Sequence, residues 1–225
     1  MNAVEIQVTS DFICPWCWIG HHALSQAVAG VLERTAGHAR VSLVYRPFEL
    51  NPDMPEEGIN RQVYRTAKFG SWERSQVRDA EVAEAGARAG LAFHFERIEI
   101  TPNTRLAHRL IEYARTAGTD AHQFDRLYAS IFEAYFSHGQ HIGLPDVLID
   151  LAAQAGFDAQ AARVWLASNG GDAEVSADET HAELEGIRAV PTTRIGSTYI
   201  QGAQPVAVFA NALDNELTRA VAHKC

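Results

Sequence analysis

The sequence predicts an α/β protein in which strands stand at the two ends of the chain and helices fill the middle. Apolar residues alternate over residues 4–9, and strand-forming residues recur over residues 192–201. From about residue 60 to residue 187 the apolar residues instead repeat every three or four positions, which is the spacing of helices. The predicted order is therefore β-α-β, a large all-helical insertion, and β-β-α.

The N-terminal part predicts a strand, a helix and a second strand. Val4, Ile6 and Val8 alternate with polar residues, a helix is expected over about residues 15–36, and residues 41–45 have strand composition. Crossovers of this kind are right-handed, so the two strands are expected to be parallel neighbours.

The middle of the chain predicts a succession of helices. Their expected positions are residues 77–89, a segment that begins after a cap at Asn103 or Thr104, an apolar stripe over 124–136, and segments near 145–155, 158–168 and 173–186. Residues 91–100 are expected to form an extended connector. Because strands flank this region on both sides, the α/β domain is assigned residues 1–58 and 188–225, and the insertion residues 59–187.

The C-terminal part predicts a hairpin followed by a helix. Gly196 and Ser197 separate two short strand-forming runs, over 192–195 and 198–201, as the two residues of a tight turn. A final helix is expected to begin at Pro205.

A Cys-x-x-Cys motif is the strongest chemical signal in the chain. Cys14, Pro15, Trp16 and Cys17 follow the first strand and open the first helix. Pro15 suits the first helical position, where its missing N–H is not needed. The positive end of the helix favours a thiolate on the first sulfur, and the second sulfur is close enough to form a disulfide with it. The motif therefore predicts a pair that cycles between dithiol and disulfide.

Two other interpretations of the motif are weaker. A structural zinc site needs further ligands, and the remaining cysteine, Cys225, is the last residue of the sequence. A permanent disulfide would close a loop too short to restrict the unfolded chain much. We therefore expect no metal, and the role of Cys225 is left open between an unpaired thiol and an intermolecular partner.

Composition and charge exclude several kinds of partner. The 225 residues are 47% hydrophobic and carry a formal net charge of -9 without a basic cluster, which argues against nucleic acid or an anionic membrane as partner. Apolar runs are too short for a membrane span, and residues 1–10 lack the features of a signal peptide. The expected location is cytoplasmic, where such a pair usually starts its cycle as a dithiol.

Segments spread along the chain resemble one family. They are residues 11–20, DFICPWCWIG, together with residues 48–52, 103–104, 107–110, 134–136 and 200–205. These resemble FrnE-like oxidoreductases of the DsbA-like branch of thioredoxin-fold proteins. The resemblance implies a thioredoxin-like fold and a protein disulfide oxidoreductase or isomerase, whose partner is a disulfide-containing protein or peptide, or glutathione.

The resemblance also implies roles for individual residues. Cys14 is the more exposed sulfur and attacks the substrate disulfide, and Cys17 resolves the mixed disulfide. Pro191 follows a cis peptide bond beside the cysteines and leaves the backbone of Val190 free to pair with an extended peptide. DsbA-like relatives have a thiolate-stabilising histidine between the cysteines. Because this chain has Trp16 instead, a less oxidising pair is expected, suited to reduction or isomerisation.

The chain departs from the family pattern at several positions. Val8 stands where many thioredoxin-like enzymes bury an acid, so no buried base is assigned there. Asp11 is expected to be an exposed loop residue rather than a catalytic acid. His21 is expected at a solvated helix position; the alternative interpretation is that its protonated ring lowers the pKa of a nearby thiol. Residues 192–194, Thr-Thr-Arg, replace the usual apolar residues and predict a more polar groove.

A second reaction class remains open. Kappa-class transferases and hydroxychromene-carboxylate isomerases share this insertion plan and use glutathione, but a serine typically stands where this chain has Cys14. No bound cofactor is expected, and glutathione as a co-substrate would contact Gln204 near the last helix and, by resemblance only, Asn51. A peptide-binding chaperone without redox turnover is a third possibility. A homodimer is a candidate assembly, and the oligomeric state is left open.

Overall fold

The computed structural model describes residues 2–36, 39–118 and 121–222. These residues form two compact units, Met1–Phe48 with His181–Cys225 and Glu49–Thr180. The domain division at residues 58 and 187 stays a prediction, and Cys225 lies outside the described residues.

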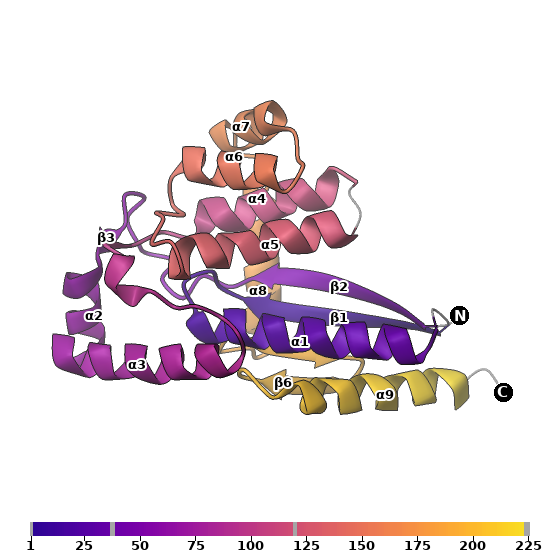
Figure 1. Ribbon diagram of the computed structural model, residues 1–225. Coiled ribbons are helices and arrows are strands. Elements are labelled where there is room, and N and C mark those ends of the chain that lie inside the picture. The colour runs from indigo at the N-terminus through magenta and orange to yellow at the C-terminus, as the bar shows by residue number, and fades with distance from the viewer. Residues whose placement is uncertain (1, 37–38, 119–120, 223–225) are drawn as a thin grey trace. The chain divides into compact units, whose positions relative to one another are not determined.

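A four-stranded sheet is the centre of the first unit (Figure 1). Its strands are β1 (Asn2–Ser10), β2 (Ala39–Pro47), β5 (Thr192–Ile195) and β6 (Thr198–Gln201), in the order β2-β1-β5-β6. β1 runs parallel to β2 and antiparallel to β5, and β5 and β6 form the expected antiparallel hairpin. The predicted fold class, a thioredoxin-like α/β arrangement, is confirmed.

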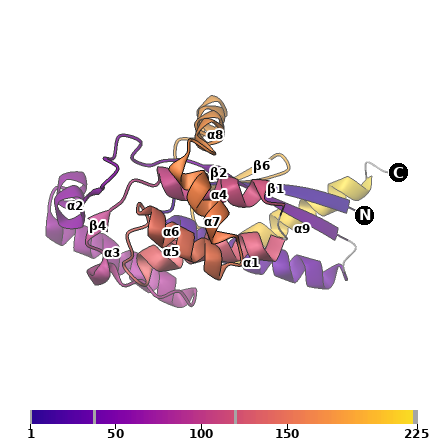
Figure 2. The ribbon, with the colours of Figure 1, turned by 90° about the horizontal axis from the view of Figure 1, so that it is seen from above.

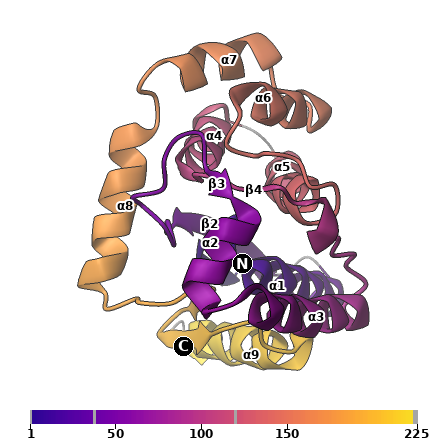
Figure 3. The ribbon, with the colours of Figure 1, turned by 90° about the vertical axis from the view of Figure 1, so that its left-hand side faces the viewer.

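Two helices cover the sheet of this unit and form its core. α1 (Pro15–Arg34) and α9 (Val206–Ala222) lie side by side against the strands (Figure 3). Alternation buries one face of β1, and the fully covered side chains of the two helices include Leu24 and Val31 from α1 and Phe209 and Leu213 from α9. Each such side chain contributes roughly 1.5–3 kcal/mol of hydrophobic stabilisation. This packing holds the start of α1 rigidly at the end of β1.

The second unit is mainly helical. Its helices are α2 (Arg61–Phe69), α3 (Trp72–Arg88), α4 (Arg105–Thr116), α5 (Ala121–Phe136), α6 (Pro145–Gln154) and α7 (Ala159–Ala167), and α8 (Asp172–Leu184) begins in it and ends in the first unit. α4, α5, α6 and α7 pack on one another (Figure 2). The apolar stripe over 124–136 lies in α5 and buries Leu127, Ile131, Phe132 and Phe136, as its spacing predicted.

The insertion differs from an all-helical one in a small detail. β3 (Ile59–Asn60) and β4 (Ile100–Thr101) pair as a two-residue antiparallel bridge, and a 3₁₀ turn, η1 (Phe95–Arg97), interrupts the expected connector. A pairing of two residues has no hydrophobic alternation that a sequence pattern would reveal.

Candidate active site

The first cysteine stands at the junction of β1 and α1. Cys14 is the N-cap of α1, with extended backbone angles, and Pro15 is the first helical residue, as predicted. The Cys14 backbone N–H donates to the Asp11 carbonyl at 3.1 Å, and the Cys17 N–H donates to the Cys14 carbonyl at 3.0 Å. No acidic residue lies in the first turn of α1.

The two residues just before β5 contribute the other side of the site. The Cys14 thiol lies 3.6 Å from the Val190 carbonyl oxygen, to which it donates, and the Val190–Pro191 peptide bond is cis, as the resemblance implied. The Pro191 carbonyl in turn accepts from the Gly202 N–H at 2.8 Å. The fold thus brings together residues that are more than 170 positions apart in the sequence.

Both cysteines are unpaired and largely covered. Cys14 is 5% exposed and Cys17 is 2% exposed, so both sulfurs are buried and the openness expected of Cys14 is absent; its role as the attacking sulfur stays a prediction. Trp16, between them, is 40% exposed. Any molecule that reaches the Cys14 sulfur must therefore displace part of its cover.

The second cysteine has an environment that keeps it protonated. Burial raises the pKa of Cys17, and the neighbouring Cys14 raises it further, while the Asp11 backbone and the Ser10 side chain oppose the shift through hydrogen bonding. Because the thiolate is the nucleophilic form of cysteine, a raised pKa makes Cys17 a weak nucleophile at neutral pH. Ser10 is a site residue that the sequence analysis missed, although its place at the end of the strand before the motif was a usable signal.

Asp11 and Val8, which precede the motif, are both buried, although Asp11 was expected to be exposed. Asp11 is completely buried, so its expected exposure is wrong. Its backbone lies in the turn that leads into α1. The Asp11 carbonyl accepts from the Cys14 N–H, and the Asp11 backbone also forms a hydrogen bond with Cys17. Val8 is buried and apolar, so its side chain supplies no base.

His21 is also buried, and its expected solvated position is wrong. One helical turn beyond Cys17, it lies 7% exposed with Nδ1 3.2 Å from the Tyr45 hydroxyl. Burial, with a smaller effect from His22, lowers its pKa from 6.5 to about 4. The ring is therefore neutral near pH 7 and cannot stabilise a thiolate by its charge.

The pKa of His21 predicts a stability change with pH. The unfolded chain binds a proton at this residue near pH 6.5, whereas the folded chain does so only near pH 4. Stability is thus complete above about pH 6.5 and falls as pH decreases toward 4, by up to about 3 kcal/mol from this residue. The free energy of unfolding is measured in urea at pH 4.5–7.5. His21→Phe is expected to lose the part of its pH dependence that comes from this residue. An exposed control, His181→Gln, is expected to keep it, and equal slopes in both variants would contradict the assignment.

Gly20 allows α1 to approach Pro191. A Cβ at this position would lie 3.2 Å from Cγ of Pro191 and 3.5 Å from Cα of Ala203. A Cβ added at Gly30, on the same helix, would approach only the flexible end of the Arg34 side chain. The first glycine is thus a packing requirement of the site, and the second is not.

This difference predicts opposite effects for substitutions at the two glycines. Gly30→Ala is expected to stabilise the protein by about 1 kcal/mol, because alanine has the higher helix propensity. Gly20→Val is expected to destabilise it by about 1–3 kcal/mol, because the added side chain would overpack against Pro191. Thermal unfolding measures both effects. Unchanged stability in Gly20→Val would show that α1 need not approach Pro191 this closely.

The two expected glutathione contacts lie in different units. In the helical unit, Oδ1 of Asn51 accepts from the Tyr64 hydroxyl at 2.6 Å, and its Nδ2 is buried without a partner among the described residues. Gln204 lies just before α9 in the first unit, and its amide donates to the Gln201 carbonyl at 2.9 Å. Their proposed binding role stays a prediction.

The described ranges contain neither a metal-binding cluster nor a membrane-spanning helix. No group of three or more His, Cys, Asp or Glu side chains in residues 2–36, 39–118 and 121–222 could hold a metal ion. In the same part of the chain no helix is long and apolar enough to cross a bilayer.

Comparison with known proteins decides the family. The sequence model of one protein family, the DSBA-like thioredoxin domain, matches residues 5–214. The chain belongs to the DsbA-like thioredoxin family. The uncharacterized protein YwbO of Bacillus subtilis (strain 168) is 30% identical over 214 residues, covering 95% of this chain and 97% of YwbO. A crystal structure of a probable DsbA oxidoreductase from Streptomyces coelicolor is similar with a TM-score of 0.84 and 29% identity, covering 96% of this chain and 90% of the other.

More distant structures share the fold of this DsbA-like chain. A 2-hydroxychromene-2-carboxylate isomerase has a TM-score of 0.69 at 15% identity, over 98% of this chain and 99% of the isomerase. The cytosolic disulfide reductase DsbM from Pseudomonas aeruginosa, solved with glutathione, has a TM-score of 0.62 at 16% identity, over 97% and 98% of the two chains. The same fold therefore occurs with two reaction classes, so the activity must be argued from the site.

Proposed function

We propose that this DsbA-like protein is a thiol-disulfide oxidoreductase or isomerase that acts through Cys14 and Cys17 on disulfides of proteins or small molecules. The observation that carries the proposal is the asymmetry of the two thiols. Cys14 stands at the start of α1 and Cys17 is held as a buried thiol of raised pKa one turn later. Together they supply one sulfur to attack and one to resolve.

The proposed reaction transfers two electrons. The Cys14 thiolate attacks one sulfur of the substrate disulfide, whose S–S bond breaks, and the released sulfur takes up a proton. Cys17 then loses its proton and attacks the Cys14 sulfur, which releases the second substrate thiol. The substrate is reduced to two thiols, and the pair is oxidised to a disulfide. A thiol reductant regenerates the pair, and glutathione, present in the DsbM structure, is our candidate for it.

Residues beside the cysteines are proposed to bind the substrate and to set the reduction potential of the cysteine pair. The Val190 backbone and Pro191 would support an extended peptide by strand-like hydrogen bonding, with Trp16 covering it from the solvent side. Trp16 supplies no positive charge to a thiolate. We therefore propose that the reduction potential of the Cys14–Cys17 pair lies well below the roughly -120 mV of the strongest oxidants of this kind. Such a potential suits reduction or isomerisation of disulfides. Cytoplasmic location and a homodimer remain predictions.

Two assays test the proposal on the wild-type protein. Insulin reduction with glutathione as reductant and refolding of scrambled ribonuclease should both be accelerated. A glutathione-dependent isomerase or transferase, the alternative favoured by the fold of the chromene isomerase, would accelerate neither. It would instead isomerise an organic substrate, or transfer glutathione to it, in a reaction that requires glutathione. A chaperone would prevent insulin aggregation without changing its thiol content.

A further inference from the structure

The helical unit contains a cavity that the proposed disulfide chemistry does not use. Its volume is about 740 Å³, and it is formed by the start of α4, the segment before α6, the segment between α7 and α8, and residues 56–57. Leu106, Leu144 and Leu166 give it apolar walls, and Arg105 and Arg109 give it charge. Cavities of this size typically accommodate small organic ligands.

Arg109 is a buried cation fixed by backbone carbonyls. It is 8% exposed, and its Nε donates to the Gly170 carbonyl at 2.8 Å. Its Nη2 donates to the Ser168 carbonyl in a short contact and to the Trp165 carbonyl at 3.3 Å. Within the described ranges no carboxylate forms an ion pair with it, and no group accepts a hydrogen bond from its Nη1. The guanidinium is held in place while one nitrogen stays open to an acceptor.

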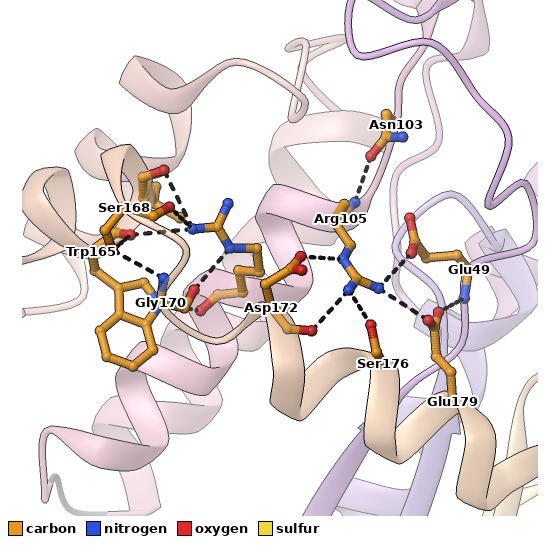
Figure 4. Close-up of polar contacts among 11 residues, drawn as sticks. Glu49, Asn103, Arg105, Trp165, Ser168, Gly170, Asp172, Ser176 and Glu179 are labelled. Atoms are coloured by element: carbon orange, nitrogen blue, oxygen red, sulfur yellow. Dashed lines mark hydrogen bonds and ion pairs between the residues drawn. The ribbon is translucent and has the colours of Figure 1, made fainter.

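Arg105, one helical turn before Arg109, is fully paired with acidic side chains. Its guanidinium donates to Asp172 at 2.8 Å, to Glu49 and Glu179 at 3.1 Å each, and to the Ser176 hydroxyl at 2.5 Å (Figure 4). Three carboxylates therefore surround this cation. Asp172 attracts Arg109 at longer range, but its hydrogen bond is with Arg105. Arg109 thus supplies the cationic nitrogen with open bonding capacity in the cavity wall.

The cavity also contains two uncompensated carboxylates. Glu56 and Glu57 line it from the segment between β2 and β3, and both are exposed. In the described part of the chain neither of them forms an ion pair. A simple anion would be attracted by Arg109 and repelled by these two residues. A ligand with a carboxylate at one end and an ammonium group at the other would be attracted by both.

We propose that this cavity binds a short peptide with free termini, its carboxylate on Arg109 and its ammonium group near Glu56 and Glu57. The apolar walls between these charges would contact the peptide side chains. Two or three residues suit the volume. The proposal uses no property of the cysteines, so it stands or fails independently of the proposed redox function.

Isothermal titration calorimetry with the reduced, full-length protein tests the proposal. The probes are the sulfur-free dipeptide Ala-Leu, its N-acetyl form and its C-terminal amide. Ala-Leu is expected to bind, and each cap is expected to weaken binding at least about tenfold, because it removes a charge-assisted contact. No binding at millimolar peptide, or equal binding of free and capped peptides, would overturn the proposal.

Variants assign the two ends of the ligand. Glu56→Gln with Glu57→Gln changes only exposed side chains and is expected to abolish the preference for a free ammonium group while the preference for a free carboxylate remains. Arg109→Gln is expected to abolish the carboxylate preference, with circular dichroism to verify folding. Leu144→Trp, at an exposed edge of the cavity, provides a second test, because it should block all peptides without touching Arg109. Glu84→Gln, which changes an exposed side chain of α3 away from the cavity, is the control. Unchanged preferences in the glutamine variants would overturn the assignment.

Discussion

Replacing Cys14 by serine is expected to abolish disulfide exchange, and replacing Cys17 by serine is expected to arrest it half-way. Without Cys14 the sulfur at the start of α1 is gone, and Cys17 is too buried and too weakly acidic to attack in its place. Without Cys17 the first attack still occurs, but no second thiol releases the substrate from Cys14. Insulin reduction should fall to the uncatalysed rate in both variants, and only Cys17→Ser should accumulate a covalent adduct.

Mass spectrometry of non-reduced samples distinguishes the two variants. The adduct on Cys17→Ser should have the mass of the protein plus one substrate chain and should disappear with dithiothreitol. Both variants are best made in a Cys225→Ser background, so that no third thiol forms the adduct. Adducts on Cys14→Ser rather than on Cys17→Ser would reverse the roles assigned to the two sulfurs.

Replacing Asp79 by alanine is expected to destabilise the protein by about 3–5 kcal/mol. Asp79, on α3, receives a hydrogen bond from Arg61 at 2.7 Å and one from Arg65 at 2.5 Å, both on α2. The three side chains are 5–17% exposed, and the Arg61 guanidinium lies over the ring of Trp72, at 5.6 Å from its centroid. Removing the carboxylate would leave two covered cations without their shared counter-charge.

A nearby ion pair on the same helix supplies the control. Arg78 and Glu81 are 3.0 Å apart, but their side chains are 63% and 52% exposed. Glu81→Ala should therefore change the free energy of unfolding by less than about 1 kcal/mol. Urea unfolding compares the two variants. A loss at Asp79 as small as that at Glu81 would show that solvent screens the cluster despite its burial.

The sequence predicted the parts of this protein that depend on local patterns. Alternation located β1, turn chemistry located the hairpin of β5 and β6, and the Cys-x-x-Cys spacing located the sulfurs at the start of α1. Pro191 was placed beside the cysteines through family resemblance, since nothing local in the sequence indicates a neighbour that far along the chain.

Burial of polar groups was the part that local patterns could not predict. Asp11 and His21 are polar residues in exposed-looking contexts, yet both are covered by tertiary packing, and His21 is neutral as a result. The largely covered state of Cys14 is a tertiary property of the same kind. Arg109 lay within a segment that resembled the family, but its bonds to the carbonyls of Ser168 and Gly170 depend on a loop about 60 residues away.

The reduction potential of the cysteine pair tests the central claim most directly. The protein is equilibrated over a series of reduced and oxidised glutathione ratios, quenched by alkylation and measured by peptide mass spectrometry. We expect Cys14 and Cys17 to lose alkylation together, in one two-electron transition with a potential well below about -120 mV. Cysteines that stay alkylated as free thiols across the whole series, or that titrate independently, would contradict the account.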